Sequence, residues 1–224
     1  MSMIKKYIIT GLTLMNAAFG CLSILAAISG DYYLSAEYIV FAIISDQLDG
    51  RVARMLKRTS DFGRELDSLA DAISFGVAPT VILYEMYLGS LGTVGTIIAL
   101  LPALCAIHRL AKFNLTEARD HFIGVPTPAN AGFVLSLVIG NVQVPAIYVA
   151  VMAVVISGLM VSKIPYYNFK NFKKLSKGEK VIIFAEIIVL LYGLAVYQSL
   201  VVIMMIMTYL VSSPFVFLFE RART

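Results

Sequence analysis

Apolar residues run along this chain in long stretches, and the polar residues gather in the short segments between them. The stretches have the length of helices that cross a bilayer, for which about 20 apolar residues are needed. The pattern therefore predicts an all-α, polytopic integral membrane protein, a helix bundle with about eight transmembrane helices. The eight stretches are residues 8–28, 34–55, 64–87, 91–113, 126–141, 144–163, 181–197 and 199–219.

The fifth and sixth stretches are separated only by a short break. The 36 residues from Thr127 to Ser162 are too many for one helix across a hydrocarbon core of about 30 Å, and barely enough for two. Proline disfavours helix in the residue before it. We therefore place the break at Val144-Pro145.

Composition agrees with a membrane protein and leaves room for one domain. Of the 224 residues, 59% are hydrophobic and 14% are charged, and this charged fraction is about half of that in soluble domains. Eight spans of about 20 residues use most of the chain. We therefore expect a single transmembrane domain over residues 1–224.

The basic residues indicate how the chain is oriented. With eight spans, all 18 Lys and Arg residues fall at one membrane face, and the loops at the other face carry none. Such residues gather in cytoplasmic loops, so both termini are expected at the cytoplasmic side of the cell membrane. The net charge of +4 then reports orientation in the bilayer, and we expect no nucleic-acid partner.

Four aspartates lie where lipid makes a charge costly. Asp46 and Asp49 stand near the end of the second stretch, and Asp67 and Asp71 near the start of the third. An ionised group within a span costs at least a few kcal/mol, and only bound cations or shared protons make such a cluster tolerable. Oxygen ligands without Cys or His favour Mg²⁺, Mn²⁺ or Ca²⁺ over zinc.

Small and basic residues accompany the carboxylates. On a helix, Gly50 and Ala53 share a face with Asp46, and Gly63 shares one with Asp67, so a bulky ligand could lie against the backbone. Three arginines nearby suit a phosphorylated ligand, although the positive-inside rule alone would also place them here. They are Arg54, Arg58 and Arg64.

The spacing of these residues is that of a signature with eight defined positions. It reads Asp46-x2-Asp49-Gly50-x2-Ala53-Arg54-x8-Gly63-x3-Asp67-x3-Asp71. At each of these positions the chain resembles the CDP-alcohol phosphotransferase family. Three further stretches look like the phosphatidylserine synthase branch of that family: Glu65–Pro79, Arg109–Asn114 and Gly124–Ala129.

The resemblance implies an integral membrane enzyme that is a homodimer with a six-helix catalytic core, so two helices here would be additional. It implies transfer from a CDP-linked lipid, CDP-diacylglycerol or its archaeal diether counterpart, with CMP as leaving group. In this branch the acceptor is L-serine. Two divalent cations, Mg²⁺ or Mn²⁺ with Ca²⁺ as another possible occupant, would be held by the four aspartates. For Asp71 the resemblance leaves three roles open: the base that deprotonates the serine hydroxyl, a metal ligand, or both.

Further residues are expected to bind substrate beside the signature. Asn16, one turn after Thr13, could hydrogen-bond the cytidine or the pyrophosphate, or could form an interhelical hydrogen bond instead. Ser68 lies inside the first branch-like stretch. Arg109 and Lys112, one turn apart, could bind the serine carboxylate or a donor phosphate, or only anchor the helix. Lys112 stands where the branch would have arginine, which weakens the case for a bidentate contact.

Other functions also use intramembrane carboxylates. The nearest alternative is the same chemistry with inositol phosphate, glycerol phosphate or choline as acceptor. An intramembrane prenyltransferase generally has more helices and does not need the small residues at this spacing. A divalent-cation or proton transporter would place its site near the midplane on broken helices, whereas these carboxylates flank a turn expected in the cytoplasm.

Overall fold

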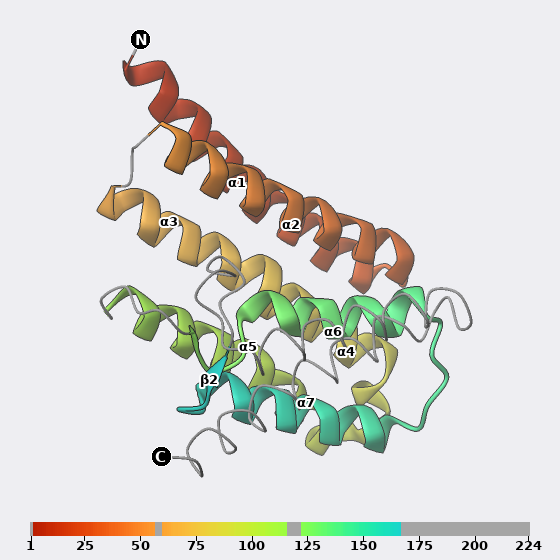
Figure 1. Cartoon of the computed structure of the whole chain (residues 1–224). Coiled ribbons are helices and arrows are strands. Elements are labelled where there is room, and N and C mark those ends of the chain that lie inside the picture. Colours follow the sequence, from red (N-terminus) through yellow and green to blue (C-terminus); the bar gives the residue numbers. More distant parts are fainter. Residues whose placement is uncertain (1, 57–59, 116–121, 167–224) are drawn as a thin grey trace, which may run out of the picture.

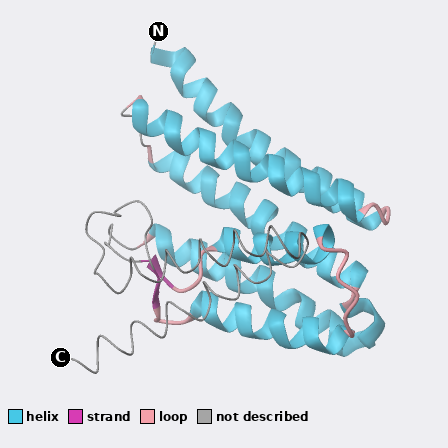
Figure 2. Ribbon diagram, turned by 45° about the vertical axis from the view of Figure 1, so that its right-hand side comes forward, coloured by secondary structure: helices cyan, strands magenta, loops and turns pink. Residues whose placement is uncertain are grey.

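A computed structural model describes residues 2–56, 60–115 and 122–166 of the chain. In these ranges the protein is helical, as expected, with one small addition (Figure 2). Two short strands, β1 (Phe122–Ile123) and β2 (Pro165–Tyr166), form an antiparallel pair. The last two expected spans, 181–197 and 199–219, lie outside the described residues.

The first two helices form an antiparallel hairpin. Helix α1 (Ser2–Ile28) and helix α2 (Tyr32–Met55) are joined by a tight turn. Gly30 has a φ of +81°, a conformation that glycine adopts without steric cost. The Asp31 carboxylate accepts a hydrogen bond of 3.0 Å from the Leu34 N–H, which caps the start of α2.

The third span is one continuous helix with a wide turn in its middle. It consists of α3 (Asp61–Asp71), the π-helical turn η1 (Ala72–Val77) and α4 (Ala78–Met86). Ser60 caps its start by accepting a hydrogen bond of 3.0 Å from the Gly63 N–H, so the helix begins three residues before the expected boundary.

Proline explains the wide turn. In a regular α-helix the Phe75 carbonyl would accept from residue 79, which is Pro79 and has no N–H. The π-turn separates the proline ring from that carbonyl. The Asn130 side chain, from another helix, donates a hydrogen bond of 3.0 Å to the Phe75 oxygen. The carbonyl is thereby satisfied inside the bundle.

Three more helices complete the described part of the bundle. After the 3₁₀ turn η2 (Leu88–Leu91) come α5 (Gly92–Asn114), α6 (Thr127–Ile139) and α7 (Ala146–Val161). The break between α6 and α7 includes Val144-Pro145, as expected from the proline.

The helix formed by α3, η1 and α4 lies in the centre of the described bundle (Figure 1). Helix α1 packs on one side of it, and α5 and α6 pack on the other. The side chains of Phe75, Ala78 and Leu83 are completely buried there. Because it runs between two layers, this helix can present polar groups to a site inside the protein.

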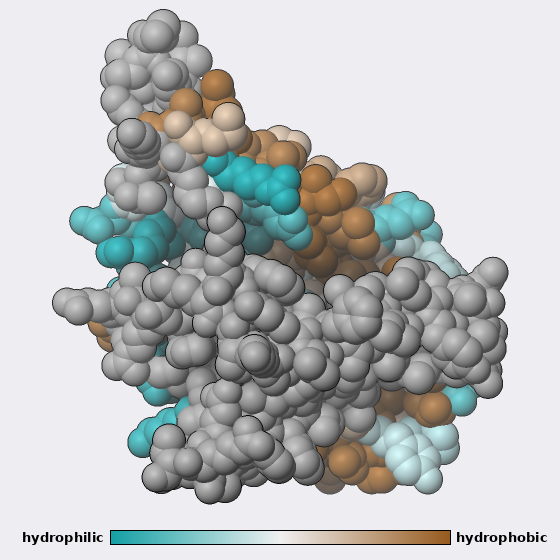
Figure 3. Space-filling view, in the orientation of Figure 1, coloured by the Kyte–Doolittle hydropathy of each residue, from teal (hydrophilic) through white to brown (hydrophobic). Residues whose placement is uncertain are grey.

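Three of the described helices are long and apolar enough to cross a membrane: Tyr7–Ile28, Asp61–Met86 and Leu88–Asn114. Helices α6 and α7 are apolar but shorter. Apolar side chains cover much of the outer surface over α1 and α2 (Figure 3), and Leu25 is 61% exposed. Such a surface is stable in lipid and costly in water. The protein is therefore a membrane protein.

Candidate metal centre

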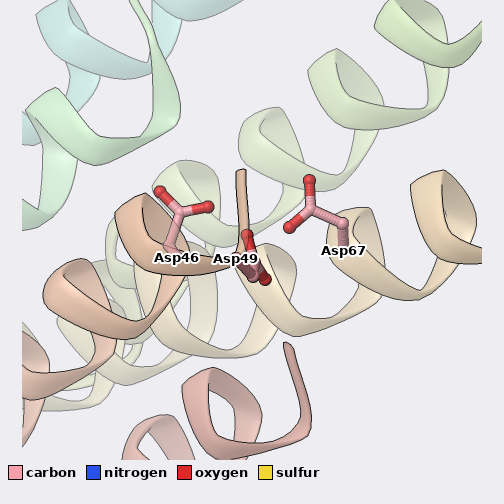
Figure 4. A group of neighbouring side chains, drawn as sticks. All are labelled: Asp46, Asp49 and Asp67. Carbon is pink, nitrogen blue, oxygen red and sulfur yellow. The ribbon is translucent and has the colours of Figure 1, made fainter. Parts of the chain in front are cut away.

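Three carboxylates from two helices meet in the structure. Asp46 and Asp49 project from α2, and Asp67 projects from α3 (Figure 4). One oxygen from each side chain lies within 4.8 Å of those from the other two. Asp49 is buried, whereas Asp46 and Asp67 are partly exposed. The acidic cluster expected from the sequence is thus found for these three residues.

The donor set fits a hard divalent cation. Mg²⁺ with ligands at about 2.1 Å places neighbouring oxygens about 3 Å apart and opposite ones about 4 Å apart, and Ca²⁺ allows up to about 5 Å. The three carboxylate oxygens lie within that range. Their mutual repulsion in a partly buried place would fall strongly once a cation lies between them.

Asp71 stands beside this triad. It lies one turn after Asp67 on α3, close enough to interact with the charges of Asp46 and Asp67. Its Oδ1 accepts a hydrogen bond of 3.0 Å from Asn16 Nδ2. The fourth aspartate is therefore near the other three, and its orientation is fixed by a residue of α1.

Helix α1 contributes buried polar groups to the cluster. Thr13 Oγ1 donates a hydrogen bond of 2.9 Å to Asp49 Oδ2. Ser74 Oγ donates one of 2.8 Å to the Asn16 carbonyl. Of the two alternatives for Asn16, the structure thus contains the interhelical hydrogen bond.

The small residues of the signature lie on the same two helices. Gly50 and Ala53 are partly buried on α2. Gly63 lies in the first turn of α3, where a Cβ atom would come within 3.1 Å of the capping Ser60 Oγ. Glycine at this position therefore keeps the helix start compact, in addition to any contact with a ligand.

The three arginines have different surroundings. Arg64 forms an ion pair of 2.9 Å with Asp61 at the exposed start of α3. The backbone of Arg54 lies in the last turn of α2. Arg58 lies outside the described residues.

The C-terminal end of α5 and the nearby Arg109 form hydrogen bonds with α3 and α6. Arg109 Nη1 donates a hydrogen bond of 2.9 Å to Thr127 Oγ1 at the start of α6. Ser68 Oγ donates to Asn114 Oδ1 at 3.1 Å, and Asn114 Nδ2 donates to Glu65 at 3.1 Å. These contacts bring together the three branch-like stretches of the sequence.

Sequence reasoning assigned no role to several residues that hold the site in place. Asn114 and Thr127 lie within the branch-like stretches, but their partners are far away in the sequence. Asn130 directly follows the third stretch, and its hydrogen-bond partner is the Phe75 carbonyl. The sequence signal for this contact is Pro79, which has no N–H to donate to that carbonyl in a regular helix. Lys112, which the sequence did single out, has an exposed side chain.

The fold and the site define a membrane-embedded helix bundle with an acidic cluster that suits a divalent cation. The chain belongs to the CDP-alcohol phosphatidyltransferase family, whose family model matches residues 8–214. This family is dependent on divalent metals, in agreement with the acidic triad.

Three relatives from different organisms have the same name. The chain is 38% identical to the CDP-diacylglycerol–serine O-phosphatidyltransferase of Bacillus subtilis over 167 residues, which are 74% of this chain and 93% of the relative. It is 39% identical to that of Helicobacter pylori over 174 residues, 72% of each chain. It is 38% identical to that of Methanocaldococcus jannaschii over 161 residues, 71% of this chain and 73% of the relative.

Proposed function

We propose that this protein transfers the phosphatidyl group of CDP-diacylglycerol, or of an archaeal diether equivalent such as CDP-archaeol, to L-serine and releases CMP. The observation that carries the proposal is the meeting of Asp46, Asp49 and Asp67 from two helices. The family match and the names of the relatives support the donor and the acceptor.

The acidic residues would hold the metal. Asp46, Asp49 and Asp67 would bind a first divalent cation, and Asp71 would complete a site for two. Bound Mg²⁺ or Mn²⁺ would supply neutralisation of the diphosphate charge and polarisation of the phosphorus under attack. Ca²⁺ could occupy the same oxygens, because it also prefers carboxylate ligands.

Asp71 has the second task of taking up a proton. The hydroxyl of serine is a poor nucleophile until it is deprotonated, and Asp71 is the aspartate outside the triad. As it accepts this proton, the serine oxygen forms a bond to the phosphorus of the phosphatidyl group. The bond from that phosphorus to the oxygen bridging to CMP breaks, and CMP leaves with the electron pair.

The remaining signature residues would bind the donor. Gly50, Ala53 and Gly63 would let the nucleotide lie close to the backbones of α2 and α3. Arg54 would contact the diphosphate, and two more basic residues would add to the positive potential: Arg58 and Arg64.

The acceptor would bind at the junction of α3, α5 and α6. Arg109, with one Nη held by Thr127, would face the serine carboxylate, and Lys112 would add positive charge. Ser68 follows Asp67 directly on α3, and its hydroxyl donates a hydrogen bond to Asn114 of α5. Asn16 would take part through its contact with Asp71.

The proposed arrangement in the membrane follows from the distribution of charge. We infer a single domain over residues 1–224 with eight spans, six of which form the catalytic core, assembled as a homodimer. The basic segments support a cytoplasmic location for both termini and for the acidic cluster. The polar substrate would enter from the cytoplasm, and the lipid tails of the donor would enter sideways from the bilayer.

An assay of CMP release with one acceptor at a time tests the proposed reaction. Purified protein in detergent, supplied with CDP-diacylglycerol and Mn²⁺ or Mg²⁺, is expected to release CMP with L-serine. The matched reactions contain inositol phosphate, glycerol phosphate or choline at the same concentration. Faster CMP release with one of these three would assign the protein to another acceptor within the same family.

Replacing Arg54 by alanine is expected to weaken binding of the CDP-linked donor about 10- to 100-fold, because a hydrogen bond to a charged group contributes about 1.5–3 kcal/mol. Titration calorimetry with the donor in the presence of Mn²⁺ measures this. Arg51→Ala, which removes an exposed charge from the same helix, is the matched control. Unchanged affinity in Arg54→Ala would leave Arg54 with the role of a membrane anchor only.

A further inference from the structure

We propose that α1 sets the geometry of the metal centre through three residues on one of its faces, Thr13, Asn16 and Gly20, here named the α1 brace. Spacings of three and four residues place them along the same side of the helix. The proposal rests on the proposed function only in that the aspartates bind a divalent cation. In this view Thr13 and Asn16 are positioning residues, which act through the carboxylates.

The first contact of the brace holds the α2 half of the site. Thr13 is 3% exposed, and its hydroxyl donates to Asp49 Oδ2 at 2.9 Å. The same hydroxyl lies 3.1 Å from the Ile9 carbonyl of its own helix, so Thr13 has another acceptor within reach. Its contact with Asp49 is therefore not needed to satisfy the threonine, but it fixes the rotation of the carboxylate and the direction of its lone pairs.

The second contact holds the α3 half. Asn16 is completely buried. Its side chain donates to Asp71 at 3.0 Å, and its backbone carbonyl accepts from Ser74, one turn further along, at 2.8 Å. Two groups of one residue thus hold two successive turns of the helix that carries Asp67.

Gly20 makes this close approach possible. A Cβ atom at this position would overlap the Ser74 hydroxyl oxygen and lie 2.8 Å from the Ser74 Cα atom. Any larger residue would therefore push α1 away from η1, and the hydrogen bonds of Asn16 would lengthen.

The packing explains why a brace is needed. Helix α1 packs along most of α2 and also against α3, η1 and α4, whereas in the described part of the chain α2 and α3 touch each other far less. The distance between Asp49 and Asp67 therefore depends on a helix that supplies no carboxylate itself. Ligands held by surrounding hydrogen bonds bind metal about 10- to 100-fold more tightly than ligands without them.

Mn²⁺ binding to the purified full-length protein, without substrates, tests the brace. Electron paramagnetic resonance of free Mn²⁺ gives the affinity in detergent micelles. Thr13→Val keeps the shape but removes the hydroxyl and is expected to weaken binding about 10- to 100-fold, whereas Thr13→Ser should stay within about threefold of the original protein. Ser23→Ala is the matched control, because Ser23 is a buried α1 residue that bonds to Ser35 on α2, away from the aspartates.

The outcomes separate a positioning role from general stability. Thermal unfolding identifies the variants that fold, and Thr13→Ala replaces the valine variant if that one does not. Wild-type Mn²⁺ affinity in a folded Thr13 variant that lacks the hydroxyl would overturn the proposal, and so would an equal loss in Ser23→Ala. If Mn²⁺ binding depends on Thr13 but none of the four tested acceptors leads to release of CMP, the proposed function is refuted and the proposal of the α1 brace remains.

Discussion

Replacing Asp67 by alanine is expected to abolish release of CMP and the metal-dependent binding of the donor. Asp67 is the member of the triad that comes from α3, so its loss leaves the two remaining carboxylates of the triad on one helix. Metal assistance contributes several kcal/mol to a reaction of this kind, and about 4 kcal/mol corresponds to a rate about a thousandfold lower. Steady-state CMP release and calorimetric donor titration, each with and without Mn²⁺, measure the two effects.

The same loss is expected for Asp46→Ala, which removes a ligand from the other helix. Glu37→Ala is the control, since Glu37 is an exposed carboxylate on α2 outside the cluster. Equal activity in Glu37→Ala and Asp67→Ala would mean that the triad is not the metal site. If donor binding by Asp67→Ala still depends on Mn²⁺, the metal also binds elsewhere than at the triad.

The hydrophobic pattern contains most of the information on where the helices lie. The first six expected spans overlap described helices, and the largest difference is at the start of α1, which begins at Ser2 and not at residue 8. A span is helical because lipid offers its backbone no hydrogen-bond partners, and it must be long and apolar to cross the hydrocarbon core. The hydrophobic pattern is less informative at α2, where Asp46, Asp49 and Arg54 interrupt the apolar run. That helix is 24 residues long, yet it is not among the three described helices that qualify as spans by length and apolarity.

The wide turn η1 could not be read from hydropathy. Residues 64–87 form one expected span, and Pro79 lies within it. Proline inside a helix permits a bend, a break or a π-turn, and the choice depends on what can satisfy the carbonyl it leaves behind. Here Asn130 does so, and that contact spans 55 residues of sequence.

The meeting of the three carboxylates was predictable from the sequence, whereas the residues that support them were not. The spacing of Asp46, Asp49 and Asp67 within two helices places all three near one turn, so their meeting follows from local geometry. The partners of these carboxylates lie on α1, and a sequence does not state which face of a distant helix is turned toward them. The sequence leaves two roles open for Asn16, which are substrate binding and an interhelical hydrogen bond. The structure contains the hydrogen bond to Asp71.

Asp71→Asn is expected to lower turnover far more than donor binding. The substitution keeps the size of the side chain and an oxygen that can accept the hydrogen bond from Asn16, so the helix contacts of the site should persist. It removes the ability to take a proton from the serine hydroxyl, a contribution of about 10²- to 10⁴-fold in general base catalysis. CMP release at saturating substrates, compared with donor affinity from calorimetry, separates the two effects.

The metal requirement distinguishes a base from a ligand at Asp71. If the side chain acts mainly as a ligand, turnover and donor affinity fall together in Asp71→Asn, and a higher Mn²⁺ concentration restores both, because added metal compensates for weaker coordination. If it acts mainly as the base, excess Mn²⁺ restores nothing, because added metal does not replace the group that accepts the proton. Persistence of the slow turnover at saturating Mn²⁺, with donor affinity within a few-fold of the original, is the result expected from the position of Asp71 beside the triad.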